Sequence, residues 1–245
     1  MRGFLAIFRR ELAGLFLGPL AWTLLCIALF LNGYLFLFYL RGSGGDVDLA
    51  LRFSLGESFV FWALCVLFPP LLTMRMVSEE ARTGLLEYLL TAPVSDFAVI
   101  AGKFAAALCF MALLWGTSFV YALVLRLLGT PVDWGVVAAG WLGALLCSAL
   151  FCGIGLWMSC LTGTPVLSAF AAVVINLCIV LAPLFAGLSG SLVLAKLVES
   201  VDVPSHLRSA FLFGVVDSAY VAFFLAWTAF FLFLSTRALE ARRWR

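Results

Sequence analysis

Charged residues are scarce in this chain. Asp, Glu, Lys and Arg make up 11% of its 245 residues, whereas 65% are hydrophobic; soluble domains carry about 25% charged residues. A soluble fold of this composition would have too few polar side chains to cover its outside. Only two of the residues are lysines, and no basic tract is interleaved with aromatic residues, so we expect no nucleic-acid partner. The composition excludes a soluble domain and favours a membrane protein.

Catalytic and metal-binding residue types are equally sparse. His206 is the single histidine, whereas a zinc protease needs a helical His pair around a Glu. Gly102-Lys103-Phe104 lacks the glycine loop and the hydroxyl of a phosphate-binding P-loop. None of the seven cysteines forms a C-x-x-C pair, and we interpret them as small buried hydrophobic residues with reduced thiols. We therefore predict no catalytic residue, no metal site and no enzymatic activity in this chain.

Long apolar runs separated by short polar turns predict an all-α, polytopic membrane protein with about six transmembrane helices. The long runs do not alternate as barrel strands do. No ionisable residue lies in the middle of a predicted span, which disfavours a charge-lined pore. Spans one and two lie within 19–77 (19–40 and 57–77), spans three to five within 97–187 (97–128, 134–161 and 166–187), and span six over 216–236.

Smaller features complete the predicted layout. Pro69 and Pro70 remove two backbone donors and should kink span two near its inner end. Asn32 and Asn176, inside spans, are expected to form hydrogen bonds between helices. Glycine pairs at 14/18 and 153/155 indicate close helix packing. The polar stretch 41–48 is expected to form a flexible external loop.

Two flanking segments mix charged and apolar residues. Residues 1–18 contain Arg9, Arg10 and Glu11 among apolar residues and predict an amphipathic helix in the membrane interface; they are also compatible with the start of the first span. Residues 188–215 interleave charged and apolar residues and predict one or two short amphipathic helices at the outer surface. All of these segments form a single membrane domain over 1–245.

The distribution of Lys and Arg predicts the orientation. Ten of these residues lie on one side of the predicted spans and five on the other, Arg41, Arg52, Arg126, Lys196 and Arg208. Positive residues are enriched on the cytoplasmic side of membrane proteins. Both termini and the connection between spans two and three are therefore expected to face the cytoplasm. An even number of spans is required for this arrangement, and six satisfies it.

The connection between spans two and three is the one sizeable charged segment in the middle of the chain. Ser78 can cap a helix, and Glu79 and Glu80 in the first turn suit the positive end of the helix dipole. An apolar stripe of leucines follows, and Pro93 should stop the helix. We predict an amphipathic helix over 78–93 along the inner membrane surface, with acidic residues free to face a partner. The alternative from these residues alone is a solvated loop.

The same segment resembles a known signature. Thr73-Met-Arg75, Ser78-Glu-Glu80, Gly84, Glu87, Leu89-Leu90, Ala92-Pro93 and Gly102-Lys103 are similar to the pattern of type 2 ABC transporter permeases. The similarity is closest to the branch of gliding-associated and nitrous-oxide-reductase-maturation permeases. A second match comprises His206, Phe211, Gly214 and Asp217, followed by an apolar span and Arg242-Arg243-Trp244. Together the matches extend over essentially the whole chain.

The resemblance implies the transmembrane permease subunit of an ATP-driven transporter, with export as the expected direction. Two permease subunits, identical or related, would associate with two separate ATP-binding subunits that hold ATP and Mg, so this chain would bind no cofactor directly. The 78–93 segment would be the coupling helix. Its expected contacts with the ATP-binding subunit are Arg75, Ser78, Glu79, Glu80, Arg82 and Glu87.

The implied location is the cytoplasmic (inner) membrane, where the lipid bilayer and, beyond it, an extracytoplasmic auxiliary protein are further partners to consider. The alternative function is a secondary transporter not driven by ATP, or a membrane scaffold subunit. Such a protein would carry midplane ionisable groups or lack the docking helix.

Overall fold

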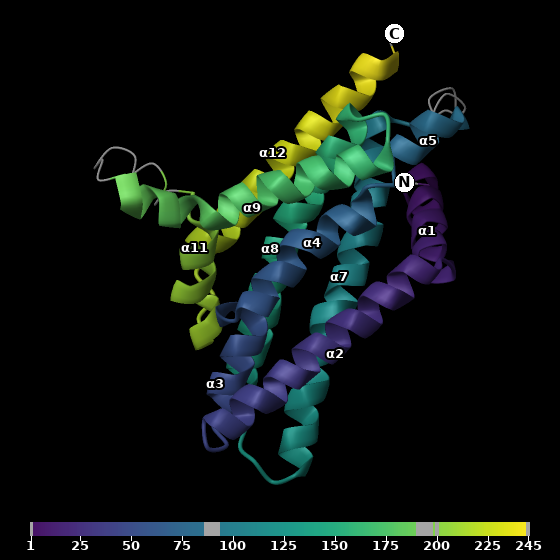
Figure 1. The fold of residues 1–245 in the computed structure, drawn as a ribbon. Coiled ribbons are helices and arrows are strands. Elements are labelled where there is room, and N and C mark those ends of the chain that lie inside the picture. The colour runs from purple at the N-terminus through teal and green to yellow at the C-terminus, as the bar shows by residue number, and fades with distance from the viewer. Residues whose placement is uncertain (1, 86–93, 190–197, 199–200, 244–245) are drawn as a thin grey trace.

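The computed structural model describes residues 2–85, 94–189, 198 and 201–243, and within these ranges the regular structure is entirely helical (Figure 1). Six helices in these ranges are long and apolar enough to cross a membrane. The prediction of an all-α polytopic protein is confirmed. In chain order the elements are α1 Arg2–Leu17, α2 Pro19–Gly42, α3 Val47–Arg52, the π-helix η1 Phe53–Glu57, α4 Phe59–Thr73, α5 Ser78–Thr83, α7 Asp96–Leu127, α8 Trp134–Leu161, α9 Pro165–Ser189, α11 Val203–Ser209, the 3₁₀-helix η2 Phe211–Phe213 and α12 Ser218–Arg243.

The first two helices are separate elements. Gly18 is extended (φ −81°, ψ 145°) and Pro19 occupies the first turn of α2, where a proline costs no hydrogen bond. Residues 1–18 are therefore not the start of span one. The predicted loop over 41–48 is shorter than expected, because α2 continues to Gly42 and Asp46 caps α3 by accepting a hydrogen bond from Leu49 N at 3.1 Å.

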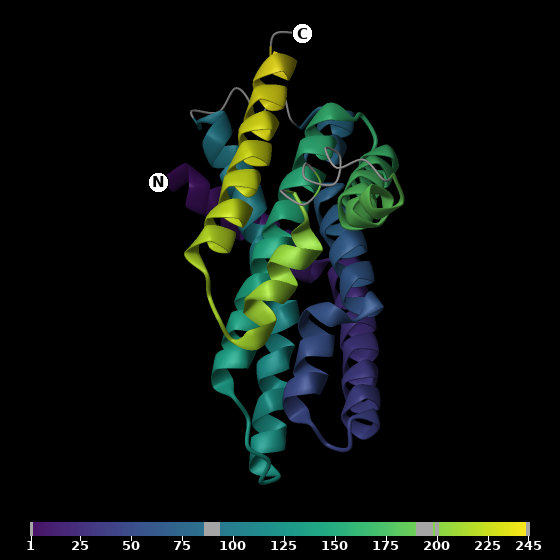
Figure 2. The same ribbon diagram turned by 90° about the vertical axis from the view of Figure 1, so that its left-hand side faces the viewer.

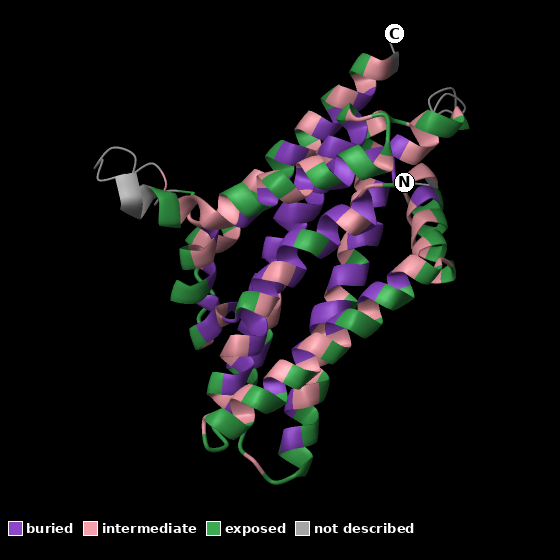
Figure 3. Cartoon of the chain, in the orientation of Figure 1, coloured by how far each residue is buried: buried purple, intermediate pink, exposed green. Residues whose placement is uncertain are grey.

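Helix α8 is the centre of the bundle. In its most apolar stretch 78% of the residues are buried, against 17% in α9. Helices α4, α7, α9 and α12 pack against it, and Figures 1 and 2 show α9 running obliquely across the bundle. Buried residues concentrate in α4, α7 and α8 (Figure 3). The single-subunit core is therefore formed mainly by these three helices, with further buried residues from α2, α11 and α12, while large apolar surfaces of α2, α9 and α12 face outward.

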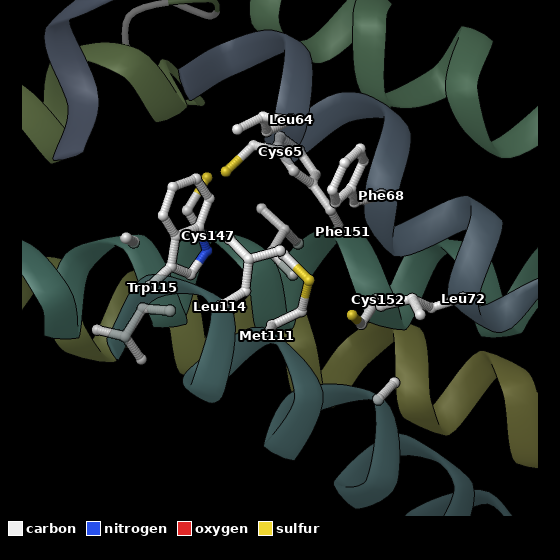
Figure 4. Close-up of a cluster of buried hydrophobic side chains, with 14 of the residues drawn as sticks. Leu64, Cys65, Phe68, Leu72, Met111, Leu114, Trp115, Cys147, Phe151 and Cys152 are labelled. Atoms are coloured by element: carbon white, nitrogen blue, oxygen red, sulfur yellow. The ribbon is translucent and has the colours of Figure 1, made fainter. Parts of the chain in front are cut away.

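The core includes one hydrogen-bonded group among apolar side chains. Trp115 Nε1 donates to Ser148 Oγ at 2.8 Å, and Cys65 Sγ lies 4.0 Å from the same oxygen. Figure 4 shows Trp115, Cys65, Cys147 and Phe151 in the buried cluster that contains this group. The cysteine prediction is partly wrong, because Cys26, Cys109 and Cys178 are exposed on the outward faces of their helices.

Helix α4 continues through both of its prolines to Thr73. A proline at position 70 leaves the carbonyl of Val66 without its helical donor. Asn176 Nδ2 on α9 donates to that carbonyl at 3.4 Å, and Asn32 accepts from Ser54 Oγ in the same interhelical manner. The predicted hydrogen bonds of the two asparagines between helices are confirmed, and the kink at Pro69 and Pro70 stays a prediction.

Close helix packing occurs at one predicted glycine pair and not at the other. A Cβ added at Gly155 would lie 2.2 Å from Thr73 Oγ1, and one at Gly153 would lie 3.3 Å from Phe231 Cβ. A Cβ at Gly14 would meet nothing within 4 Å. The packing prediction is confirmed for 153/155, where α8 meets α4 and α12. It is wrong within this subunit for Gly14, which faces a cavity.

The described part of the 188–215 segment contains two short elements, α11 and η2, and α11 has exposed residues (Ser205, Arg208 and Ser209) as well as buried ones, as predicted for an amphipathic helix. Leu207 and Phe211 are fully buried. A Cβ added at Gly143 of α8 would lie 2.7 Å from Leu207 Cδ1 and 2.8 Å from Phe211 Cβ. Glycines in α8 and η1 thus let α11 approach closely. Residues 190–197, 199 and 200 lie outside the described residues. Helix α12 extends to Arg243, beyond the expected end of span six at 236.

Candidate functional site

The charged connection between α4 and α7 begins with a turn that α8 holds in place. Ser159 Oγ on α8 accepts hydrogen bonds from Val77 N (3.2 Å) and Ser78 N (3.1 Å), and it donates to Met74 O at 3.1 Å. One serine from another helix thus satisfies backbone donors at the start of α5, which otherwise lack partners. The prediction that Ser78 caps the helix is wrong. Val77 is the N-cap residue, and the buried Ser78 hydroxyl donates back to Met74 O.

Helix α5 is shorter than predicted. It ends at Thr83, where Gly84 adopts a left-handed conformation (φ 76°) that glycine reaches without steric cost. The expectation of one continuous helix over 78–93 is therefore wrong at Gly84. Glu87 and most of the leucine stripe lie outside the described residues. Leu85 is exposed (58%).

A fully buried lysine connects α5 to two other helices. Lys103, in the second turn of α7, has no exposed side-chain surface. Its Nζ donates to Met76 O at 2.6 Å and to Glu11 Oε1 at 2.9 Å. The same nitrogen lies 2.9 Å from Glu80 Oε2, an ion pair outside hydrogen-bond geometry. Helix α1 and the α4–α5 segment, far apart in the sequence, therefore meet α7 at one ammonium group.

Arg10 completes this cluster on its outer side. Its guanidinium contacts Glu11 Oε1 at 2.6 Å and also pairs with Glu80 Oε1. The side chains of Glu11 and Glu80 are each 15% exposed, whereas Arg10 is 52% exposed. We call Arg10, Glu11, Glu80 and Lys103 the charge cluster. Two positive and two negative groups balance within it, which satisfies the requirement that buried charges be paired.

The pKa values of the α1 residues reflect this arrangement. Burial by itself raises the pKa of Glu11, but the Lys103 ammonium and the Arg10 guanidinium outweigh it, and the pKa lies below its ordinary value of 4.5. Burial likewise lowers the pKa of Arg10, and the carboxylates of Glu11 and Glu80 more than reverse that effect. Glu11 and Arg10 are therefore both charged at neutral pH.

A more exposed side of α5, with the turn that precedes it, carries a different kind of interaction. Arg75 Nε lies 3.8 Å from Glu79 Oε2, and the two side chains are 59% and 40% exposed. Arg82 is also exposed. An exposed pair of this spacing contributes about 0.3–0.5 kcal/mol, whereas removing one partner of a buried pair costs about 3–5 kcal/mol. The inward face of α5 is thus firmly bound within the subunit, and the outward face keeps its charges accessible.

These positions divide the residues expected to contact a partner. Arg75, Glu79 and Arg82 lie on the accessible face, while Ser78 and Glu80 are directed into the subunit. In α1, Arg9 is exposed, and Arg10 and Glu11 belong to the charge cluster. Sequence reasoning missed Lys103 as a partner of Glu11 and Glu80. The available signal was its position several residues inside a predicted span, where an unpaired lysine would be costly.

A cavity of about 680 Å³ lies between the α1–α2 corner and the α4–α5 turn. Its wall is mixed, with apolar side chains from α2 and α4 and the carboxylates of Glu11, Glu79 and Glu80. Gly14 and Gly18 also line it, which explains why Gly14 has no close neighbour. No group of three or more potential metal ligands occurs in the described part of the chain.

Helix α5 lies between two long apolar helices in the sequence and at the end of the molecule where both chain termini lie (Figure 1). A comparison with protein families agrees with this layout. Residues 49–240 match the model of the ABC-2 family transporter proteins. The chain belongs to this family. The match covers α5, Lys103 and everything through most of α12, whereas α1 precedes it. The part that α1 plays in the charge cluster is therefore a finding of the structure and not of the family match.

A comparison with curated protein sequences finds no match. Family membership assigns the chain as a transmembrane subunit of an ABC transporter, a multi-pass membrane protein whose transporter also contains an ATP-binding partner. The particular branch of permeases suggested by the sequence stays a prediction.

Proposed function

We propose that this permease transmits ATP-driven movement of a separate ATP-binding subunit to the membrane helices, as the transmembrane half of an exporter. The accessible face of α5, with Glu79 and Arg82, and Arg75 in the preceding turn would contact that subunit. The observation that carries the proposal is the two-sided nature of α5. Its inner side is bound to α1, α7 and α8, so a force on its outer side reaches three helices at once.

The arrangement of the chain ends supports the same reading. The N- and C-terminal ends of the described chain lie at the same end of the molecule as α5 (Figure 1). Ten of the 15 Lys and Arg residues fall on this side of the predicted spans, and positive residues mark the cytoplasmic side. In this proposal the permease lies in the inner membrane. Helix α5 and both termini face the cytoplasm, where ATP is available.

The remaining components follow from this role. ATP and Mg would be held by the ATP-binding subunit, and this chain would contribute no catalytic group. A second permease subunit, identical or related, would complete the membrane part, consistent with the largely exposed apolar stretches of α2 and α9, which are 22% and 17% buried.

The test is a pull-down of tagged permease from native membranes in mild detergent, with ATPase activity measured in the purified material. The variant Glu79→Lys/Arg82→Glu exchanges charges on the accessible face of α5 and leaves the charge cluster intact. The matched control is Arg237→Glu/Glu240→Lys, which exchanges an exposed pair 2.8 Å apart on α12.

We expect the wild type and the control to retain the copurified ATPase activity. In the α5 variant this activity should fall at least about tenfold, which corresponds to a loss of about 1.4 kcal/mol of binding free energy. Stable wild-type protein that brings no ATPase under these conditions contradicts ATP coupling and leaves the scaffold or secondary-transporter alternative.

A further inference from the structure

The charge cluster links α1 to α5 through a residue that belongs to neither. Lys103 of α7 contacts Glu11 of α1 and Glu80 of α5, and Arg10 bridges the same two carboxylates from outside. Every charged contact between α1 and α5 that the structure describes passes through these four side chains. The two helices are 61 residues or more apart in sequence, from Leu17 to Ser78, so the link is made by folding alone.

The position of the cluster determines how α5 can move. Shifting α5 away from α1 would leave the fully buried ammonium of Lys103 with one carboxylate in place of two, and separating buried opposite charges is unfavourable because little water is present to solvate them. Shifting α1, α5 and the first turns of α7 together keeps the pairs intact. Two helices joined in this way move most easily as one body.

The apolar contacts of α1 and α5 are unequal. α1 packs closely on α7, since a Cβ added at Gly102 would lie 3.0 Å from Ile7 Cγ2 and 3.3 Å from Phe4 O. In α5 itself only Ser78 is buried. The described contacts that retain α5 are the hydrogen bonds to Ser159, the packing of Ala81 against an apolar cluster that includes Ile7 and Val99, and the charged contacts. In this short helix, where one residue is buried and only Arg82 and Thr83 are exposed, the charge cluster supplies the ionic contacts to α1 and α7.

We propose that Lys103 is a positioning residue that clamps α1 to α5, so that the N-terminal helix and the docking helix respond to the ATP-binding subunit as a single body. This inference rests on the proposed function, because it concerns how movement of α5 spreads into the membrane part. In this inference α1 moves together with α5 when the ATP-binding subunit moves. The side chain that connects the two helices, Lys103, lies in the first turns of α7.

The experiment measures distances between spin labels in the intact complex with its copurified ATP-binding subunit. Labels are placed on cysteines at Leu5 of α1, Thr83 of α5 and Trp134 at the far end of α8, all exposed, after replacement of the exposed native cysteines. Leu5–Thr83 reports the clamp, and the two distances to Trp134 report movement relative to the core. Each is measured without nucleotide and after trapping with ATP and vanadate.

In the otherwise wild-type complex we expect Leu5 and Thr83 both to shift relative to Trp134 on trapping, while the Leu5–Thr83 distance stays constant. In Glu11→Gln/Glu80→Gln/Lys103→Met, which keeps the shapes and removes every charge of the cluster except that of the exposed Arg10, Thr83 should still shift, Leu5 should not, and the Leu5–Thr83 distribution should broaden. If the triple variant does not assemble, Glu11→Gln alone, which weakens only the α1 side of the clamp, is expected to broaden the same distribution.

The outcomes separate the two proposals. If neither label shifts in the wild-type background, ATP does not move α5, and the proposed function fails. If both shift but the Leu5–Thr83 distance changes between nucleotide states, or if the neutral variants keep the coordinated shift, the clamp is wrong while ATP coupling stands. The control Arg237→Gln/Glu240→Gln should behave as wild type.

Discussion

The two ends of the molecule are held together in different ways. At the end that carries α5, helices from distant parts of the chain meet through ions and hydrogen bonds, centred on Lys103 and Ser159. At the opposite end, α3, η1, α11 and η2 meet α8 through apolar contacts with glycines. A Cβ added at Gly140 would lie 2.8 Å from Leu55 Cδ1, and one at Gly143 would lie 2.7 Å from Leu207.

This difference explains how one small subunit can have both a movable and a fixed end. Close apolar packing tolerates little displacement, because even a small gap or overlap at packed surfaces costs energy. Ion pairs between side chains with several rotatable bonds can remain intact while the segments they join change their position together relative to the rest of the bundle. We therefore expect the glycine-packed end to act as the rigid reference and the charged end to transmit movement.

The largest effect is expected from Lys103→Met, which sharpens the comparison at the charged end. The substitution leaves Glu11 and Glu80 buried with Arg10 as their remaining charged partner, at a cost of about 3–5 kcal/mol. The midpoint of thermal unfolding in detergent should fall by on the order of 10 °C. The neutral triple variant should recover most of this loss, because no unpaired charge remains buried. A Lys103→Met variant that unfolds at the wild-type midpoint contradicts the account of the cluster.

At the glycine-packed end, Gly143→Ala is the corresponding change. The new Cβ would lie 2.7 Å from Leu207 Cδ1 and 2.8 Å from Phe211 Cβ, and overpacking of this kind costs about 1–3 kcal/mol. The matched control is Gly14→Ala, where the Cβ meets nothing within 4 Å and helix propensity favours alanine by about 0.5–1 kcal/mol. Thermal unfolding of the two variants should move in opposite directions. Equal shifts of the unfolding midpoint in the two variants would contradict the distinction between the two ends.

The smallest effect is a pH dependence confined to the charged end. The pKa of Glu11 lies below its ordinary value of 4.5 in the folded protein, so the stability that its carboxylate contributes is complete above that value and is lost as the pH falls through the folded-state pKa. Glu11→Gln should therefore lower the unfolding midpoint at pH 7 and show a smaller difference from wild type below pH 4.5. A difference that is constant with pH would show that ionisation of Glu11 does not stabilise the fold.

Local sequence patterns were reliable for elements whose length and polarity are decided by neighbours in the chain. The break at Gly18-Pro19 and the long helix α8 match the predicted boundaries. Patterns were less reliable where a tertiary contact replaces a local one. Serine is a common N-cap residue, and for that reason the sequence predicts that Ser78 caps the helix. In the structure Ser159 of α8 accepts the backbone hydrogen bonds there, and the buried Ser78 side chain faces Met74.

The same reason explains why the candidate site was only partly visible. Glu79 and Glu80 are adjacent and chemically equivalent, so the sequence offers no basis for assigning one to the surface and the other to the interior. The structure separates them, because α5 presents Glu79 outward to Arg75 and Glu80 inward to Lys103. The family resemblance identified the segment. The orientation of α5 about its own axis determines which of its side chains face outward and which face the subunit.

Composition and periodicity by themselves determined that the chain is a helical membrane protein with six apolar spans and a charged connection after the second, since too few polar residues are present to form any soluble surface. Only the tertiary structure decided that Glu11, Glu80 and Lys103 form one cluster and that α11 packs onto Gly143. Those contacts join residues tens of positions apart, and charge pairing and close packing depend on distances in space that no local pattern encodes.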